Sequence, residues 1–145
     1  MSKPNSRVVL GFDFGMKYIG IAAGQTISNT ATAITSLQAK NGIPEWDKIA
    51  ALIHEWRPAA LIVGLPLNMD GTTQPIADRA QEFANILAIK YALPVHMVDE
   101  RLSTWDAKTQ LKLNKARLTK QELVKINALS AVILTEQWLQ QKKCD

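Results

Sequence analysis

Asp13 differs most clearly in chemical type from the residues around it. It lies in the apolar segment GFDFG, residues 11–15, where a carboxylate buried without a partner would be strongly destabilising. A basic side chain, a ring of backbone donors or a divalent cation would offset that cost. The alternative is an aspartate that only forms a turn at the end of a strand. The setting therefore indicates a candidate catalytic or metal-binding carboxylate.

A second pair of carboxylates, Asp99 and Glu100, ends another apolar segment and precedes Arg101. Adjacent residues of an extended chain point to opposite faces, so only one of the pair is expected to face Asp13. Glu100 follows a predicted parallel strand, and ligands gather at the carboxyl ends of such strands. Two carboxylates that lie close repel each other unless a proton or a metal separates them. Oxygen ligands favour Mg²⁺ or Mn²⁺. An ion pair between Glu100 and Arg101 is the alternative.

The elements that would position these carboxylates follow from the hydrophobic pattern. Apolar and β-branched segments predict five strands, at residues 7–14, 17–24, 30–37, 59–66 and 94–99. Helical periodicity and capping signals predict helices at residues 46–56, 75–91, 104–113 and 119–141. This order predicts an α/β fold whose mixed five-stranded sheet has three antiparallel hairpin strands, then two parallel strands, with helices on both faces. It is the element order of the ribonuclease H-like fold.

Three motifs make the chain similar to a known family. DFG at 13–15 followed by IGIA at 19–22, VGLPLNMDGT at 63–72 and DERLST at 99–104 closely resemble the YqgF family, also called RuvX. The resemblance covers nearly the whole chain. It implies a ribonuclease H-like fold related to Holliday junction resolvases, and a nuclease that matures the 5′ end of pre-16S ribosomal RNA. It also implies an acidic centre at Asp13 and Glu100.

One position departs from the pattern that the resemblance implies. A third acid is expected near the start of the last helix, but residues 126–134 read INALSAVIL and place Asn127 there. An amide oxygen still binds a cation but carries no charge. The loss of one unit charge about 4 Å from another costs about 4 kcal/mol at an effective dielectric constant near 20. Asn127 is therefore a candidate catalytic residue that would weaken binding of a second metal ion, with Asp99 and Asp106 as candidate substitutes.

Several polar residues would contact a phosphate backbone. Lys17 follows the first predicted strand and would stabilise charge that develops on a phosphate, and Arg101 would orient carboxylates or phosphate. Asn68 lies in a polar loop after a parallel strand, where substrate contacts are expected. Residues 101–145 contain nine Lys or Arg and four Asp or Glu, and Lys108 and Lys112 in this basic region would hold the backbone. A solvated helix surface is the alternative.

These residues and the resemblance predict a metal-dependent endonuclease that hydrolyses phosphodiester bonds. Asp13 and Glu100 would hold one or two cations, and a metal-bound water would attack phosphorus. Precursor rRNA is the expected substrate, with structured DNA, as for a junction resolvase, as an alternative. Another alternative is a nucleic-acid-binding module whose catalysis Asn127 has weakened. Sugar-kinase and actin-like ATPase lobes begin similarly, but 145 residues leave no room for their second lobe.

Composition restricts the remaining classes of protein. The length and the net charge of +4 predict a single domain, residues 1–145, that suits a polyanionic partner. One cysteine excludes an internal disulfide or a zinc finger made by this chain alone, and it predicts a reducing, cytoplasmic location. No apolar run approaches the roughly 20 residues of a membrane span, so no membrane partner is expected. Both a monomer and a homodimer fit the sequence.

Overall fold

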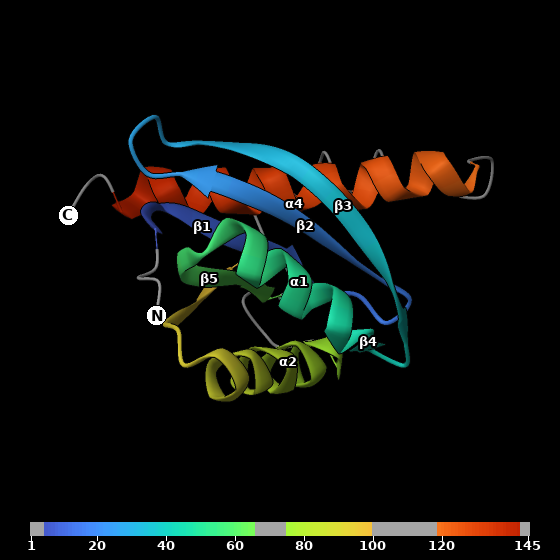
Figure 1. The fold of residues 1–145 in the computed structure, drawn as a ribbon. Coiled ribbons are helices and arrows are strands. Elements are labelled where there is room, and N and C mark those ends of the chain that lie inside the picture. Colours follow the sequence, from blue (N-terminus) through green and yellow to red (C-terminus); the bar gives the residue numbers. More distant parts are fainter. Residues whose placement is uncertain (1–4, 66–74, 100–118, 143–145) are drawn as a thin grey trace.

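A computed structural model describes residues 5–65, 75–99 and 119–142, which form a mixed six-stranded sheet with helices on both faces (Figure 1). The strand order across the sheet is β4-β3-β2-β1-β5-β6. None of the helices in these ranges is long and apolar enough to cross a membrane. The elements are β1 (Asn5–Asp13), β2 (Tyr18–Gln25), β3 (Thr30–Lys40), β4 (Ile43–Pro44), α1 (Trp46–Trp56), β5 (Pro58–Leu65), α2 (Pro75–Tyr91), β6 (Val95–Asp99) and α4 (Lys120–Lys142).

The first part of the sheet is an antiparallel meander of β1, β2 and β3. Its register places Asp13 opposite Gly20, and Gly20 opposite Ser36. Residues 14–17 connect β1 to β2, a longer connection than the two-residue turn that the sequence suggests. A Cβ atom on Gly15 would lie 2.5 Å from the backbone oxygen of Tyr18. The chain therefore needs glycine at this position to turn so closely after Asp13.

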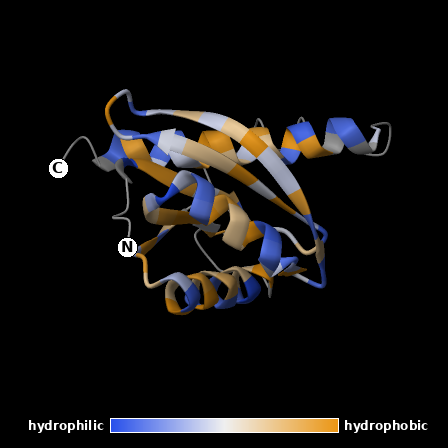
Figure 2. Ribbon diagram, in the orientation of Figure 1, coloured by the Kyte–Doolittle hydropathy of each residue, from blue (hydrophilic) through white to orange (hydrophobic). Residues whose placement is uncertain are grey.

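The second part of the sheet is parallel, because helices α1 and α2 bring the chain back to the end of the sheet at which β1 begins. β5 pairs with β1, and β6 pairs with β5. The larger core cluster lies between the sheet and these two helices, where Phe83 packs against the rings of Phe12, Phe14 and Trp46. Figure 2 shows hydrophobic and hydrophilic residues alternating along α1 and α2, as expected for helices with one face on a sheet.

The long helix α4 covers the opposite face of the sheet (Figure 1). It begins as the sequence predicts, because the Thr119 Oγ1 accepts a hydrogen bond of 3.1 Å from the backbone N–H of Glu122. A second apolar cluster joins α4 to β1, β5 and β6, and it includes Val9, Ile62, Val98 and Leu134. The sheet is therefore covered on both sides, with α4 alone among the described elements on the second side.

The sheet has one strand more than the five that the sequence pattern predicts. The two residues of β4 pair with Ala39 and Lys40, in a segment expected only to break the chain. A two-residue strand has no periodicity, so its pairing partner alone defines it. The other described strands and helices agree with the predicted ranges to within a few residues. The helix expected at residues 104–113 lies outside the described residues.

Candidate functional site

Asp13 is the last residue of β1, and its side chain is partly buried. Residues directly opposite each other in antiparallel strands point to the same face of the sheet. Gly20, the partner of Asp13, faces α4, because a Cβ atom added to Gly20 would lie 1.9 Å from the backbone oxygen of Asn127. The Asp13 carboxylate therefore lies on the face that α4 covers.

Asn127 lies on α4 directly above Gly20, next to Asp13 in the register of the sheet. The missing side chain of Gly20 is what lets the helix backbone approach β2 so closely. The two residues that the sequence predicts from distant motifs are thus brought together at a single glycine. The Asn127 Nδ2 is buried and, among the described residues, has no hydrogen-bond partner.

Ser36 on β3 extends this polar group by one strand. It pairs with Gly20, is only 8% exposed, and its Oγ finds no hydrogen-bond partner in the described part of the chain. A buried polar atom without a partner costs about 1–3 kcal/mol, which a bound water or ligand atom would recover. We call Asp13, Gly20 and Ser36, together with Asn127 above them, the Asp13 row. No sequence motif marks Ser36, because its place in this row depends on strand register.

The ends of the parallel strands β5 and β6 lie level with the Asp13 row. Phe12 pairs with Val63, so Asp13 is level with Gly64, which pairs with Val98 of β6. Val98 packs in the cluster on the α4 side, and it therefore shares the face of Asp13. The carboxyl ends of β1, β5 and β6 thus meet at one end of the sheet. Glu100 directly follows β6 but lies outside the described residues.

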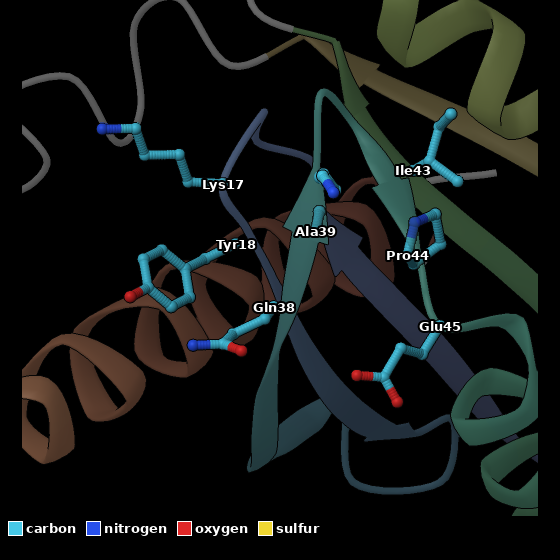
Figure 3. Close-up of a pocket in the computed structure, with 8 residues that line it drawn as sticks. Lys17, Tyr18, Gln38, Ala39, Ile43, Pro44 and Glu45 are labelled. Carbon is cyan, nitrogen blue, oxygen red and sulfur yellow. The ribbon is translucent and has the colours of Figure 1, made fainter.

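Lys17 lies in the loop after β1 and is exposed. Its backbone oxygen accepts a hydrogen bond of 2.7 Å from the N–H of Ala39, and the oxygen of Met16 accepts one of 2.9 Å from Gly42. These bonds attach the loop to the end of β3. Lys17 also lines an open hollow of about 490 Å³ whose wall includes Tyr18, Gln38 and Ile43 (Figure 3).

The Asp13 row has the donor chemistry of a site for a hard divalent cation. Asp13 supplies a carboxylate, and an end-for-end flip of the Asn127 amide would place its oxygen where the nitrogen now lies, whereas Ser36 lies two strands away from Asp13. Oxygen donors of this kind suit Mg²⁺ or Mn²⁺. Within the described residues, however, no group of three or more His, Cys, Asp or Glu side chains is close enough to hold an ion. A further carboxylate would have to come from outside those ranges.

Other residues predicted for the site also lie outside the described ranges. These are Asn68, Arg101, Lys108 and Lys112, together with Glu100. Their roles in catalysis or nucleic-acid binding stay predictions. Of the eight predicted site residues, the structure describes Asp13, Lys17 and Asn127, and it brings Asp13 and Asn127 together through their contacts with Gly20.

Comparison with known proteins identifies close sequence relatives. The model of the family described as "RuvX: Holliday junction resolvase" matches residues 7–141. A protein named "Putative pre-16S rRNA nuclease" from Pectobacterium atrosepticum is 45% identical over 136 residues, which cover 94% of this chain and 97% of the relative. The protein of the same name from Shewanella oneidensis is 48% identical over 138 residues, with coverage of 94% and 96%.

Solved structures of two resolvases share the architecture. RuvC of T. thermophilus in complex with a Holliday junction substrate superposes with a TM-score of 0.51 at 14% identity, covering 94% of this chain and 95% of that one. The Fowlpox virus resolvase in complex with Holliday junction DNA gives a TM-score of 0.50 at 12% identity, with coverage of 91% and 98%. At these identities the likeness concerns the fold, and it confirms the predicted ribonuclease H-like architecture.

Proposed function

Because the chain belongs to the RuvX family, whose model matches residues 7–141, we propose that it is a metal-dependent nuclease that hydrolyses phosphodiester bonds at the Asp13 row. The observation that carries this proposal is the position of Asn127, whose backbone lies over Gly20, the strand partner of Asp13. Two motifs that are more than a hundred residues apart in sequence supply one polar site, and it contains buried polar atoms that have no hydrogen-bond partner among the described residues.

The substrate that we propose is precursor 16S rRNA, because full-length relatives at 45–48% identity carry that activity in their names. Four-way junction DNA is the second candidate, since the family description names a Holliday junction resolvase. Both are polyanions, in keeping with the net charge of +4. Work on precursor rRNA would take place in the cytoplasm, and we propose that location for the single domain of residues 1–145.

Asp13 and Glu100 would hold Mg²⁺ or Mn²⁺, with the amide oxygen of Asn127 as a neutral ligand. Strand alternation supports Glu100 as the partner of Asp13, because Val98 shares the face of Asp13 and a residue two positions further along an extended chain returns to that face. The bound cation supplies Lewis-acid stabilisation of the negative charge on the phosphate.

The remaining steps depend on side chains of the protein itself. The contact between β1 and α4 would hold the Asp13 carboxylate in place on the face that the helix covers. Lys17, exposed beside the end of β1, would stabilise negative charge on the phosphate that is cut. Asn68, Arg101, Lys108 and Lys112 would bind neighbouring phosphates, which orient the strand without reading its sequence.

Cleavage assays with one matched variant test this proposal. The protein is incubated with Mn²⁺ and either a fragment spanning the 5′ end of precursor 16S rRNA or a four-way DNA junction. We expect cleavage of the RNA, and a loss of about 100-fold or more in Asp13→Asn, which keeps the size of the side chain but removes its charge. Equal rates for the protein and the variant would contradict the role of Asp13. Preference for the junction would select the second substrate.

A further inference from the structure

Two residues that line the hollow beside Lys17 lie on the same strands as members of the Asp13 row. Tyr18 of β2 pairs with Gln38 of β3, and each lies two residues beyond a member of the row, Gly20 and Ser36 respectively. Alternation therefore places Tyr18 and Gln38 on the face of Asp13, about 7 Å further along the strands. We call the hollow bounded by Lys17, Tyr18, Gln38 and Lys40 the β2–β3 groove (Figure 3).

The β2–β3 groove carries positive charge that no described acidic side chain pairs with. Within the described ranges, neither Lys17 nor Lys40 forms an ion pair. The one acid in the wall, Glu45, lies 3.5 Å from the ammonium group of Lys48, which offsets its charge. Two exposed ammonium groups in a hollow next to a candidate phosphate-cutting centre are complementary to a chain of phosphates.

The groove also contains an aromatic ring that other rings do not cover. Tyr18 is partly buried and lies beside Gln38 in the wall (Figure 3), and no ring contact to it occurs among the described residues. Aromatic side chains in a basic groove bind unpaired bases by stacking, which needs no particular sequence. Paired bases inside a duplex do not offer that surface.

The floor of the groove is held in place before any ligand binds. Backbone hydrogen bonds join Lys17 to Ala39 and Met16 to Gly42, and the Arg79 guanidinium of α2 donates to the backbone oxygen of Asn41. These contacts fix the end of β3 against the loop that follows Asp13. A preformed groove loses less conformational entropy when a ligand binds.

We propose that the β2–β3 groove holds a single, unpaired nucleic-acid strand that continues from the cleavage site, with its phosphates at Lys17 and Lys40 and one base on the ring of Tyr18. This inference rests on the proposed nuclease function and specifies which form of nucleic acid the enzyme takes. The substrate would be a junction between duplex and single strand, or a single-stranded tail, rather than a continuous duplex.

Binding measured without cleavage tests the proposal. The probe is a fluorescein-labelled oligouridine of about ten nucleotides, a length within the range that single-stranded binding sites cover, and fluorescence anisotropy is recorded in EDTA over a series of salt concentrations. We expect the Lys17→Ala/Lys40→Ala variant to lower the slope of log affinity against log salt by about 1.4, because each lost contact to a single strand contributes about 0.7.

Substitutions of Tyr18 test the stacking contact separately. We expect Tyr18→Leu to weaken binding roughly 5- to 150-fold without a change in the salt slope, whereas Tyr18→Phe keeps the affinity. Lys90→Ala is the matched control, because Lys90 lies over the ring of Trp46, outside the groove. Thermal melting of every variant establishes that each is folded, and Lys40→Ala alone provides a milder second test.

The outcomes separate this inference from the proposed function. The proposed role of the groove is wrong if the double lysine variant binds like Lys90→Ala, or if Tyr18→Leu binds like the unchanged protein. It is also wrong if a duplex of equal length competes as well as the single strand. Binding with the expected variant effects, but without any cleavage of RNA or junction DNA, would refute the nuclease and leave the groove intact.

Discussion

Gly20 shows at the scale of one residue why the site forms. A Cβ atom there would lie 1.9 Å from the oxygen and 2.4 Å from the carbon of the Asn127 carbonyl, so Gly20→Ala forces the helix backbone to move. We expect a loss of about 3 kcal/mol in the free energy of unfolding. Gly24→Ala is the milder comparison, because its Cβ would lie 2.8–3.1 Å from side-chain atoms of Thr135, Val9 and Leu139 and would not meet backbone. Urea denaturation compares the two, and equal stabilities would contradict the backbone clash.

Asn127 determines how much charge the site carries. Asn127→Asp places a second carboxylate near Asp13, so in EDTA like-charge repulsion should lower the melting temperature. Mn²⁺ should reverse that loss, because a ligand at about 100 times its Kd stabilises the folded state by about 2.7 kcal/mol. We therefore expect Mn²⁺ to raise the melting temperature of Asn127→Asp more than that of the unchanged protein. Equal shifts would mean that the side chain does not reach a bound cation.

The residues of the site were predictable only where a motif contains them. Asp13 stands out as a charge in an apolar strand, and Asn127 stands out against the pattern of similar sequences. Ser36, Tyr18 and Gln38 carry no comparable signal, because ordinary polar residues of strands join a site only through pairing register. That register depends on contacts between distant parts of the chain, which local patterns do not encode.

At the scale of elements, α4 must be held at a fixed place on the sheet. Helix α4 makes a polar contact with the sheet in addition to its apolar contacts. The Glu136 carboxylate accepts a hydrogen bond of 2.9 Å from the backbone N–H of Ala31 on β3. This bond joins the helix to β3, the strand that also carries Ser36. It also satisfies a backbone donor of β3, whose outer side pairs, within the described ranges, only with the two residues of β4.

Removal of the Glu136 carboxylate should loosen that connection. We expect Glu136→Ala to lower the free energy of unfolding by about 1 kcal/mol and to speed hydrogen exchange at the Ala31 amide, because the donor loses its acceptor. Glu136→Gln keeps an acceptor oxygen and should protect the amide better than alanine does. Unchanged exchange at Ala31 in Glu136→Ala would show that the bond does not hold α4 to β3.

The elements themselves were more predictable than the contacts between them. Helix α1 and helix α2 begin and end at the predicted residues, because proline, apolar periodicity and helix ends coincide there. The short strand β4 was missed, since Ile43 and Pro44 form a strand only by pairing with β3. Local sequence patterns therefore predict long helices and strands well, whereas a strand of two residues depends on tertiary pairing and is not predicted by them.

At the scale of the whole molecule, the chemistry gathers at one end of the sheet. The carboxyl ends of β1, β5 and β6 and the beginning of β2 meet there, because β1 runs antiparallel to β2 and parallel to β5. Arg7 and Gln25 lie at the opposite end of the same two strands. The length of β1 between Arg7 and Asp13 separates the two ends by about 20 Å.

This separation lets a paramagnetic ion locate the site without any measurement of activity. Bound Mn²⁺ broadens amide signals of nearby residues in a nuclear magnetic resonance spectrum, and the effect falls steeply with distance. We expect Mn²⁺ to broaden the amides of Gly20, Gly64 and Asn127 strongly and those of Arg7 and Gln25 weakly, since the last two lie at the far end of β1 and β2. Mg²⁺, which is diamagnetic, provides the control for shifts caused by binding alone.

The Asp13→Asn variant decides whether the broadening reports on the proposed centre. Because the amide that replaces the carboxylate carries no charge, Mn²⁺ binding should weaken and the broadening at Gly20 and Asn127 should require a higher ion concentration. A pattern centred near Arg7, or one that Asp13→Asn leaves unchanged, would place the ion elsewhere. The description of the fold would stand, but the metal site would not lie at the carboxyl ends of β1, β5 and β6.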